Sequence, residues 1–562
     1  MILSQEEIIR MRKFYQWVSI SNFNEKIMTI RKISILLLVI GTLTACEDVD
    51  QPLTNDYPET AFWKTQDEAL AALTACYENM YRSDYFFGNE ALSDNAYNKG
   101  NGFGNVSQIS NGGYDGRTGR VAEEWSYHYW GINKCNLVLE NADRAVTDAN
   151  LLARIKAEAR FIRAFHHFQL ATWYGDVPLV NKVLTLAEAK VITRTPRAQV
   201  IQSVLEELEI AEADLPVVYS DATDRGRIIK AAAIALRARV NLYESNWEQV
   251  VQDCEKLINT TDNGVFTLVP RYEKIFTLDN EYNKEIIFDL QYGAARTYDA
   301  QRFFLPQSVG KLRSNLVPSE SLVSDYVMIN GKGIHDAGSD YDEENPYENR
   351  DPRFKKTIIH HGSKIYDLDG KLQEILTYPG STPSLNTIEN QVASPSGYYF
   401  RKYYDSTASN FNSGINLILI RYADVLLMYA EAKHELGQMN AAIWDKTIKL
   451  LRQRAGFDEP EALEFDVTLS SDDLRTVIRR ERRTELAFEG LHIYDIRRWK
   501  TIESVLNEPV KGIRITTNQF PKDENGNILV DRRVFLPRHY FWPIPQYEID
   551  QNKNLLPNNP GW

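Results

Sequence analysis

Two carboxylates on one predicted helix face are the residues best placed to do chemistry. The segment 479–489 (RRERRTELAFE) has helical periodicity, and Glu481 and Glu485 share a stripe with apolar side chains. A carboxylate on an apolar face must be ion-paired, hydrogen-bonded or shifted in pKa. Such a pair could serve as general acid and base in glycoside hydrolysis. Because arginines surround the pair, Arg482 among them, we favour a structural ion network.

A second set of charged residues lies in a nearly all-apolar segment, 421–432 (RYADVLLMYAEA). Arg421, Asp424 and Glu431 stand at i, i+3 and i+10 and would share one face of a helix. We interpret them as a second buried ion network, which sets geometry more surely than it adds stability.

Motifs for catalysis or metal binding are otherwise incomplete. His434-Glu-Leu-Gly-Gln438 begins like a zinc-protease helix but lacks the second histidine. The stretches 367–370 and 523–526 resemble calcium loops without the spaced ligands, so we interpret them as turns. No nucleophile elbow, Cys-x-x-Cys pair or dinucleotide-binding glycine motif occurs. The sequence predicts a non-enzyme without cofactor or metal site, although calcium stays open as an alternative that no motif supports.

Helices must position these residues, and most of the chain has helical periodicity. The clearest apolar face lies in 151–174, followed by Gly175 as an αL helix cap. Helix pairs with tight turns are predicted at 229–244 with 247–257, and at 418–436 with 441–454. Further helices are predicted at 60–82, 121–145 and 196–214. Small residues at the contacts and large Trp or Tyr knobs resemble tetratricopeptide units, with a generic α-bundle as the alternative. We predict a mainly α scaffold of such pairs, with long loop-rich insertions and a few short strands.

Two regions differ from this helical pattern. Gly, Asn and Tyr dominate 93–118, and Gly, Asn, Pro and Tyr dominate 262–415, which includes the acidic stretch 336–351. Long segments without regular structure are uncommon unless they are functional. We therefore expect short strands and binding surfaces in 262–415, the insertion on the ligand face of the scaffold, and a second polar, aromatic loop at 93–118.

The first 45 residues contain a leader. The apolar run 33–45 is too short to span a bilayer, and it follows two basic residues. We interpret Met28 as the true start, 28–45 as a signal peptide and 1–27 as an upstream extension.

Leu43-Thr-Ala-Cys46 resembles a bacterial lipobox. The resemblance implies diacylation of Cys46, and an ordinary signal peptide with an incidental cysteine is the alternative. The acidic and polar stretch 46–60 would then be a tether that resembles an export tag for the outer face of the outer membrane.

Composition narrows the class of protein. The 562 residues are 43% hydrophobic and 25% charged, which excludes disordered and multi-span membrane chains. The net charge of −13 argues against a nucleic-acid binder. Tyrosine and tryptophan, 30 and 10 residues, suit flat apolar ligands or interfaces. We expect Cys76, Cys135 and Cys254 to be buried and free.

Several long segments carry a family resemblance. They are 157–164 (AEARFIRA), 174–178 (YGDVP), 421–432, 481–490 (ERRTELAFEG), 494–499 (YDIRRW), 541–545 (FWPIP) and 556–562 (LPNNPGW). In this order they resemble the signatures of the SusD/RagB family over essentially all of 46–562. We divide the body into an N-terminal helical region, 61–260, and a C-terminal region, 261–562.

The resemblance implies a surface lipoprotein of the outer membrane that captures oligosaccharides or polysaccharides. It also implies a lid on a SusC-type TonB-dependent transporter, an α-helical tetratricopeptide-like fold and no catalytic group. An extracellular lipoprotein glycosidase and a helical scaffold that binds only proteins are the alternatives. Whether the ligand is a glycan or a peptide stays open.

Ligand contacts are predicted from chemistry, because the family signatures match scaffold positions. Sugars stack C–H faces on aromatic rings, and Asp, Asn and Arg meet their hydroxyls. The candidates in the two loop regions are Asp94, Tyr97, Asn98, Tyr114, Arg296, Tyr298 and Phe303.

Overall fold

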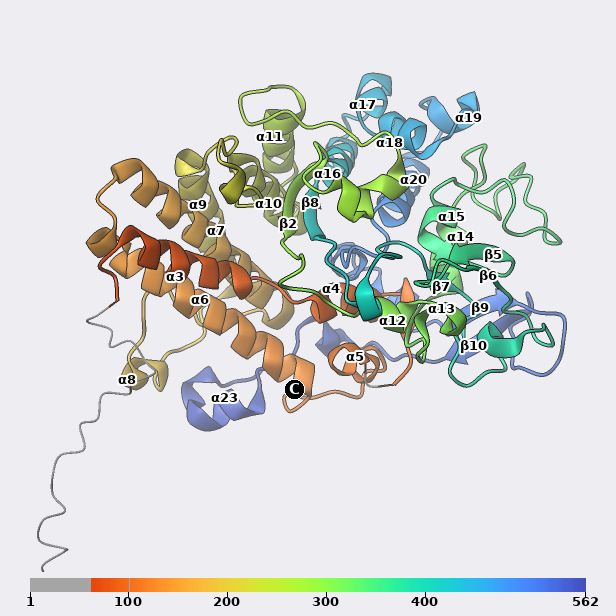
Figure 1. Cartoon of the computed structure of the whole chain (residues 1–562), viewed down its shortest axis with the longest axis horizontal. Helices are drawn as coiled ribbons and strands as arrows, with labels where there is room; N and C mark the ends of the chain where they lie inside the picture. The colour runs from red at the N-terminus through yellow and green to blue at the C-terminus, as the bar shows by residue number, and fades with distance from the viewer. Residues whose placement is uncertain (1–61, 101) are drawn as a thin grey trace, which may run out of the picture. The chain divides into compact units, whose positions relative to one another are not determined.

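Helical hairpins build the first half of the described chain (Figure 1). The computed structural model describes residues 62–100 and 102–562. Cys46 and the predicted regions 1–27, 28–45 and 46–60 lie outside these residues.

The helices of this half are long and closely packed. They are α3 (Gln66–Glu78), α4 (Ser83–Leu92), α5 (Gly102–Ser110), α6 (Gly119–Ala145), α7 (Ala149–Tyr174), α8 (Leu186–Ala189), α9 (Arg197–Asp214), α10 (Lys230–Tyr243) and α11 (Trp247–Ile258), with the 3₁₀ helix η1 (Ala222–Asp224). Helix α7 packs between α6 and α9, and α10 packs against α9 and α11.

Local sequence explains why these helices start and meet where they do. Thr65 and Glu68 form a capping box at the start of α3, and the Asp148 carboxylate caps α7. Gly131 lets α6 approach α7, since a Cβ there would lie 2.0 Å from His166 Nε2.

The second half mixes short helices with loops. Its α-helices are α12 (Gln301–Phe304), α13 (Gln307–Gly310), α14 (Glu320–Asp325), α15 (Phe354–Thr357), α16 (Tyr422–Glu435), α17 (Ala441–Lys446), α18 (Ile448–Ala455), α19 (Pro460–Leu463), α20 (Ser471–Glu485), α21 (His492–Arg498), α22 (Ile502–Leu506) and α23 (Gln546–Gln551). Its 3₁₀ helices are η2 (Tyr272–Phe276), η3 (Leu278–Asn280), η4 (Ser384–Asn386), η5 (Ser409–Phe411), η6 (Pro537–Tyr540) and η7 (Lys553–Leu555). Helix α16 contacts α10, α11 and α20, so it joins the two halves.

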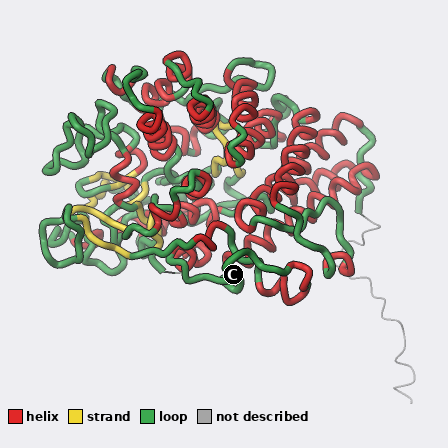
Figure 2. The backbone as a smooth tube through the Cα atoms, turned by 180° about the vertical axis from the view of Figure 1, so that it is seen from behind, coloured by secondary structure: helices red, strands yellow, loops and turns green. Residues whose placement is uncertain are grey.

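Strands occur only as antiparallel pairs among the described residues. Figure 2 shows most of them beside the loops at one end, and Figure 1 shows β2 and β8 nearer the middle. The pairs are β1 (Ala96–Asn98) with β3 (Leu316–Pro318), β2 (Ile286–Leu290) with β8 (Leu417–Arg421), β4 (Ile358–Ile359) with β7 (Tyr399–Phe400), β5 (Ser363–Tyr366) with β6 (Leu372–Ile375), and β9 (Val510–Arg514) with β10 (Asn527–Asp531). The β1–β3 pair joins the two predicted loop regions directly.

Buried aromatic contacts connect segments that are distant in sequence. Trp173 of α7 stacks on Trp542 with ring centroids 4.4 Å apart. Phe400 of β7 stacks on Phe488 at 3.8 Å. Such pairs add about 1 kcal/mol each beyond the area they bury. Through these contacts the 61–260 and 261–562 regions, and the loops, pack in one shared core. The boundary between the two regions stays a prediction.

The mainly α fold with few short strands is confirmed. The predicted helices 151–174, 229–244, 247–257, 121–145 and 196–214 match α7, α10, α11, α6 and α9. The cap residue Gly175 has a positive φ of +73°, but its ψ of −115° lies outside the left-handed helical region, so the predicted αL conformation is corrected. Cys76, Cys135 and Cys254 are buried and free, as predicted.

Three predicted segments are corrected. Residues 418–421 belong to strand β8, because Ile286–Leu290 offers a pairing partner that the local sequence does not reveal. The return helix 441–454 breaks at Thr447, whose φ of −128° and ψ of −91° are not helical. The 93–118 loop contains β1 and α5.

None of the helices in the described part of the chain combines the length and apolar character that a membrane span needs.

Candidate functional site

The Glu485 carboxylate is fully buried among three arginines. Its oxygens accept hydrogen bonds from Arg421 Nη1 at 2.7 Å, from Arg353 Nη1 at 2.9 Å and from Arg454 Nη2. Although burial opposes ionisation, these guanidinium charges hold the pKa of Glu485 well below its usual range. A permanently ionised carboxylate without solvent contact cannot donate a proton to a leaving group.

Glu481, one turn earlier on α20, has a similar environment. Its oxygens accept from Arg353 Nη1 at 2.6 Å and from Arg452 Nε at 2.9 Å. Burial opposes ionisation, but these two arginines lower the pKa of Glu481. The Glu481 and Glu485 side chains therefore belong to an ion network in the interior and do not line a cleft.

Arg421, Asp424 and Glu431 are all buried, but they do not pair with one another. Arg421 ends β8 before α16 begins, so its side chain reaches Glu285 and Glu489 in addition to Glu485. The expected single network of these three residues is therefore corrected.

Asp424 and Glu431 share α16 and are linked through other residues. Arg482 contacts Asp424 at 2.6 Å and Asp495 at 2.9 Å, and Arg498 contacts Asp495 at 2.9 Å and Glu431 at 2.6 Å. This alternating chain of charges fastens α16, α20 and α21 together.

Four of the seven candidate ligand contacts, Asp94, Asn98, Tyr114 and Tyr298, are buried, which argues against direct contact with a ligand. Asn98 Nδ2 donates to the carbonyl oxygens of Gly100 and Gly102. Tyr114 packs against the rings of His539 and Trp562. Tyr298 is 6% exposed and pairs through its backbone with Ser413. These side chains support the loops because they fill the space beneath them.

The Asp94 carboxylate is paired within the protein. It contacts Arg483 at 2.7 Å and His492 at 3.0 Å. Tyr97 is half-buried on β1 opposite Val317. Arg296 is exposed, donates to the carbonyl of Glu78 and lies 5.0 Å from the ring centroid of Tyr292.

Phe303 lies in a small pocket where the two loop regions meet. The pocket has a volume of about 150 Å³ and is lined by Ser83, Asp84, Gly102, Phe103, Asp299, Ala300 and Phe303. The rings of Phe103 and Phe303 meet edge to face, with centroids 6.0 Å apart. We call this the Phe103–Phe303 pocket.

An unusual backbone presents Phe103. Phe103, Gly104 and Asn105 have φ values of +54°, +72° and +64°, three left-handed residues in succession. A side chain costs about 1–2 kcal/mol in this conformation. Strain of this kind concentrates where a ligand must be met. Sequence reasoning missed Phe103, although the run 100–104 (GNGFG) marks the glycine-rich turn that carries it.

Charged side chains surround this pair of rings. Asp84 is partly exposed and pairs with Arg82 at 2.8 Å. Asp299 is half exposed, with Arg302 4.0 Å away. The pocket thus combines apolar ring surface with hydrogen-bond acceptors and donors at its rim.

The comparisons with known proteins agree with this architecture. A model of the SusD family matches residues 284–562, and a model described as starch-binding and associating with the outer membrane matches residues 51–242. The chain belongs to the SusD/RagB family. Together the two matches span most of the body of the protein, including 93–118 and most of 262–415.

Individual SusD-like proteins are similar over almost the whole chain. The SusD-like protein P2 of Formosa agariphila is 26% identical and covers 94% of this chain and 99% of its own. A SusD-like carbohydrate-binding protein of Bacteroides fragilis is 29% identical, with a TM-score of 0.78 over 88% of this chain and all of its own. A laminarin-binding SusD-like protein is 22% identical, with a TM-score of 0.65, and supports the fold alone.

Metal ligands do not gather in the described part of this SusD-like chain, where no group of three or more His, Cys, Asp or Glu is suitably placed. At the two calcium-like stretches, Asp367 and Asp523 accept backbone hydrogen bonds within their own turns.

Proposed function

We propose that this SusD-like protein binds oligosaccharide or polysaccharide nutrients at the Phe103–Phe303 pocket and delivers them to a SusC-type TonB-dependent transporter. The observation that carries the proposal is the half-buried edge-to-face pair of rings in a pocket that Asp84 and Asp299 also line, on the surface that both loop regions form. Membership of a family whose matching model is described as starch-binding supports it.

The chemistry of the pocket suits a sugar. A pyranose ring presents apolar C–H groups on its faces, which pack on aromatic rings, and hydroxyls at its edge, which donate to carboxylates. Phe103 and Phe303 supply the first kind of contact, and Asp84 and Asp299 supply the second. Because the Phe103 backbone is fixed in the left-handed turn, little conformational entropy is lost on binding.

Anchoring follows from the predicted lipobox. Acylation of Cys46 would place the protein on the outer membrane, with 46–60 as the tether on the exterior side. A Cys46→Ser variant should then leave the membrane fraction, since each buried CH₂ of the acyl chains contributes about 0.8 kcal/mol.

A glycosidase is the first alternative. It would need two carboxylates lining a cleft about 5–10 Å apart. Glu481 and Glu485, the original candidates for that pair, are instead paired with arginines in the interior. We therefore propose binding without hydrolysis.

Calorimetry with residues 47–562, which include the whole compact unit Trp63–Trp562, tests this function. The protein is titrated with a panel of neutral and anionic oligosaccharides, and the mixtures are then assayed for new reducing ends. We expect binding with intact ligand, and Phe303→Ala should weaken it about 10-fold or more. Phe303→Tyr keeps the ring and is the matched control.

Two results would contradict the proposal. New reducing ends would indicate a glycosidase. Wild-type affinity in Phe303→Ala would place the ligand elsewhere. Co-purification of the lipidated chain with its transporter in the absence of any sugar ligand, together with no binding to the panel, would favour the scaffold alternative.

A further inference from the structure

A second and larger cavity lies among the loops of the C-terminal region. Its volume is about 800 Å³, within the range of small-molecule sites. Four tyrosines from three separate segments line it, and we call it the tyrosine cleft: Tyr341, Tyr347, Tyr378 and Tyr398. It shares no lining residue with the Phe103–Phe303 pocket.

Neighbouring rings fix the orientation of these tyrosines. Tyr347 stacks on His360 with centroids 4.2 Å apart, and Tyr378 stacks on His361 at 4.0 Å. Tyr398 meets Tyr347 edge to face at 6.3 Å. The aromatic wall is therefore organised before any ligand arrives, which lowers the entropic cost of binding.

Hydrogen-bonding groups stand beside this wall. The Tyr398 hydroxyl donates to Glu320 Oε2 at 2.6 Å, and the Ser324 hydroxyl donates to Glu320 Oε1 at 2.8 Å. The β9–β10 hairpin contributes Thr516, Thr517 and Asn525 from its connecting loop and Asn527 from β10. A narrower cavity of about 290 Å³ shares five lining residues with the cleft and extends it: Glu320, Ser324, His335, Asn525 and Asn527.

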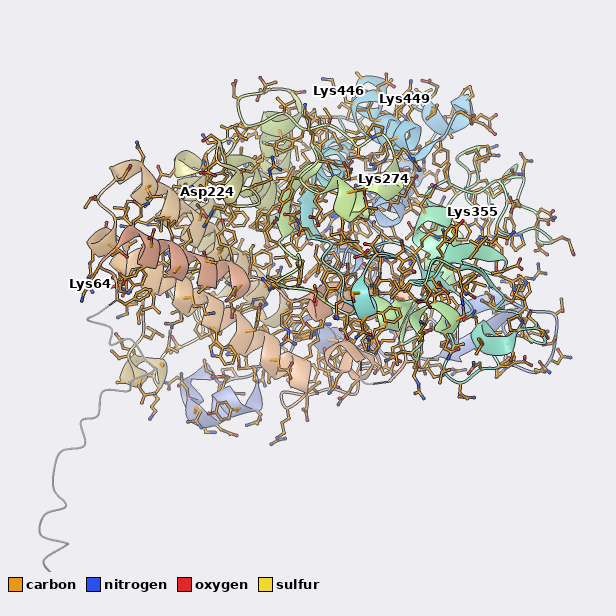
Figure 3. The ribbon with its side chains drawn as sticks, viewed as in Figure 1. Lys64, Asp224, Lys274, Lys355, Lys446 and Lys449 are labelled. Carbon is orange, nitrogen blue, oxygen red and sulfur yellow. The ribbon has the colours of Figure 1, made fainter. Side chains whose placement is uncertain are left out.

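The acidic stretch 336–351 forms one side of the cleft and is held in place. The buried Arg350 donates to the carbonyl oxygens of Val323, Tyr326 and Pro346. Lys355 of α15, labelled in Figure 3, pairs with Glu348 at 3.0 Å. These bonds fix Tyr341 and Tyr347, which the same stretch carries.

Charge distinguishes between classes of ligand. The described lining residues include the carboxylates of Glu320, Glu343, Glu344 and Glu524. Of the two lining arginines, Arg514 is paired with Glu343 at 2.5 Å, and Arg350 is committed to backbone carbonyls. A sulfated or uronate-rich oligosaccharide would be repelled by the net negative charge of the cleft, and both lining arginines already have partners within the protein.

We propose that the tyrosine cleft is a second binding site, and that it takes an uncharged oligosaccharide. The half-buried rings of Tyr341, Tyr347 and Tyr378 would stack on sugar faces, while Glu320 and the amides and hydroxyls of the β9–β10 hairpin would bind sugar hydroxyls. Two separated sites on one protein chain would bind a polysaccharide at two points along its length. Such bivalent binding gives the polysaccharide a higher apparent affinity than either site alone.

The experiment measures stoichiometry and affinity by calorimetry, with short uncharged oligosaccharides and residues 47–562. We expect two sites per wild-type chain. Tyr341→Ala should remove one of them or weaken it about 10-fold. Tyr341→Phe, which keeps the ring, should bind within about three-fold of wild type. Phe303→Ala should remove the other site.

Further variants and ligands separate this proposal from unfolding and from the first site. Tyr366→Ala removes an exposed tyrosine outside the cleft and should keep both sites, and thermal melting checks that each variant folds. Sulfated oligosaccharides should not bind in the tyrosine cleft, so Tyr341→Ala should leave their binding unchanged. A Tyr341→Ala variant with wild-type stoichiometry and affinity overturns the proposal, whatever Phe303→Ala does. A wild-type chain that binds only one equivalent, or only a peptide, overturns it as well.

Discussion

Arg421 and Glu485, 64 residues apart in sequence, form an ion pair of 2.7 Å with neither side chain exposed to solvent. The pair joins the last residue of β8 to the last residue of α20. Three buried arginines form ion pairs with this one carboxylate. Each of them loses an ion-pair partner if Glu485 is removed or protonated.

Removing Glu485 should destabilise the protein strongly. In Glu485→Ala the guanidinium groups of Arg353, Arg421 and Arg454 stay buried with one acceptor missing, which costs about 3–5 kcal/mol. The measurement is the free energy of unfolding from urea titration. Lys553→Ala, which breaks an exposed pair with Asp550, is the control and should change it by about 0.5 kcal/mol or less. Equal losses in the two variants would contradict the prediction.

Stability should fall as the solution becomes acidic, and Glu431 should contribute to the fall. Although burial opposes ionisation, the Arg498 guanidinium lowers the pKa of Glu431 from 4.5 to about 2. Because the pKa of Glu431 is lower in the folded state than in the unfolded state, its ionised form stabilises the fold at pH values above the unfolded pKa. This contribution is lost as the pH drops from about 5 towards 2. The full contribution is about 3 kcal/mol.

The measurement is the free energy of unfolding at several pH values for wild type and Glu431→Gln. The variant is expected to be less stable at pH 7, and the difference should narrow towards pH 2. A constant difference across that range would show that the contribution of Glu431 does not arise from its charge.

Two substitutions at Phe103 should separate its backbone strain from its ring. Glycine tolerates a φ of +54°, whereas alanine keeps the steric conflict. Phe103→Gly should therefore unfold with a free energy about 1 kcal/mol higher than that of Phe103→Ala. Both variants lose the ring, so both should bind oligosaccharide about 10-fold more weakly. An alanine variant as stable as the glycine variant would argue against strain at this turn.

A methyl group at Gly131 should disturb the contact between α6 and α7. The Cβ of Gly131→Ala would lie 2.0 Å from His166 Nε2, and the buried His166 ring is hydrogen-bonded to His128. Overpacking of this kind costs about 1–3 kcal/mol. In the matched Gly113→Ala control the nearest atom is 3.9 Å away, and the thermal midpoint should stay close to that of wild type. Similar midpoints for both variants would contradict the prediction.

Local sequence predicted the long helices because their apolar faces repeat within a few residues, as in α7. It failed at 418–421, where the partner strand β2 comes about 130 residues earlier and overrides the helical pattern. It also placed Arg421 on the face of a helix that begins only at Tyr422, and so assigned it the wrong ion partners.

The candidate site could be predicted only at the level of regions. The two loop regions do meet, and Phe303 lines the pocket they form. Asn98, Tyr114 and Tyr298 are buried because loops of this length need an interior of their own, and residue type alone cannot separate that interior from the surface. Phe103 was missed because its exposure depends on a left-handed turn that composition does not specify.

The stacked Trp173 and Trp542 have a consequence for how the protein is made. Asn559 Nδ2 donates to the carbonyl of Tyr174 from 385 residues further along the chain, and also to the carbonyl of Trp542. The contacts that cover Trp173 and the end of α7 can therefore form only after nearly all of the polypeptide has been synthesised. This order suits the export that the predicted signal peptide implies, because a translocation channel passes unfolded polypeptide.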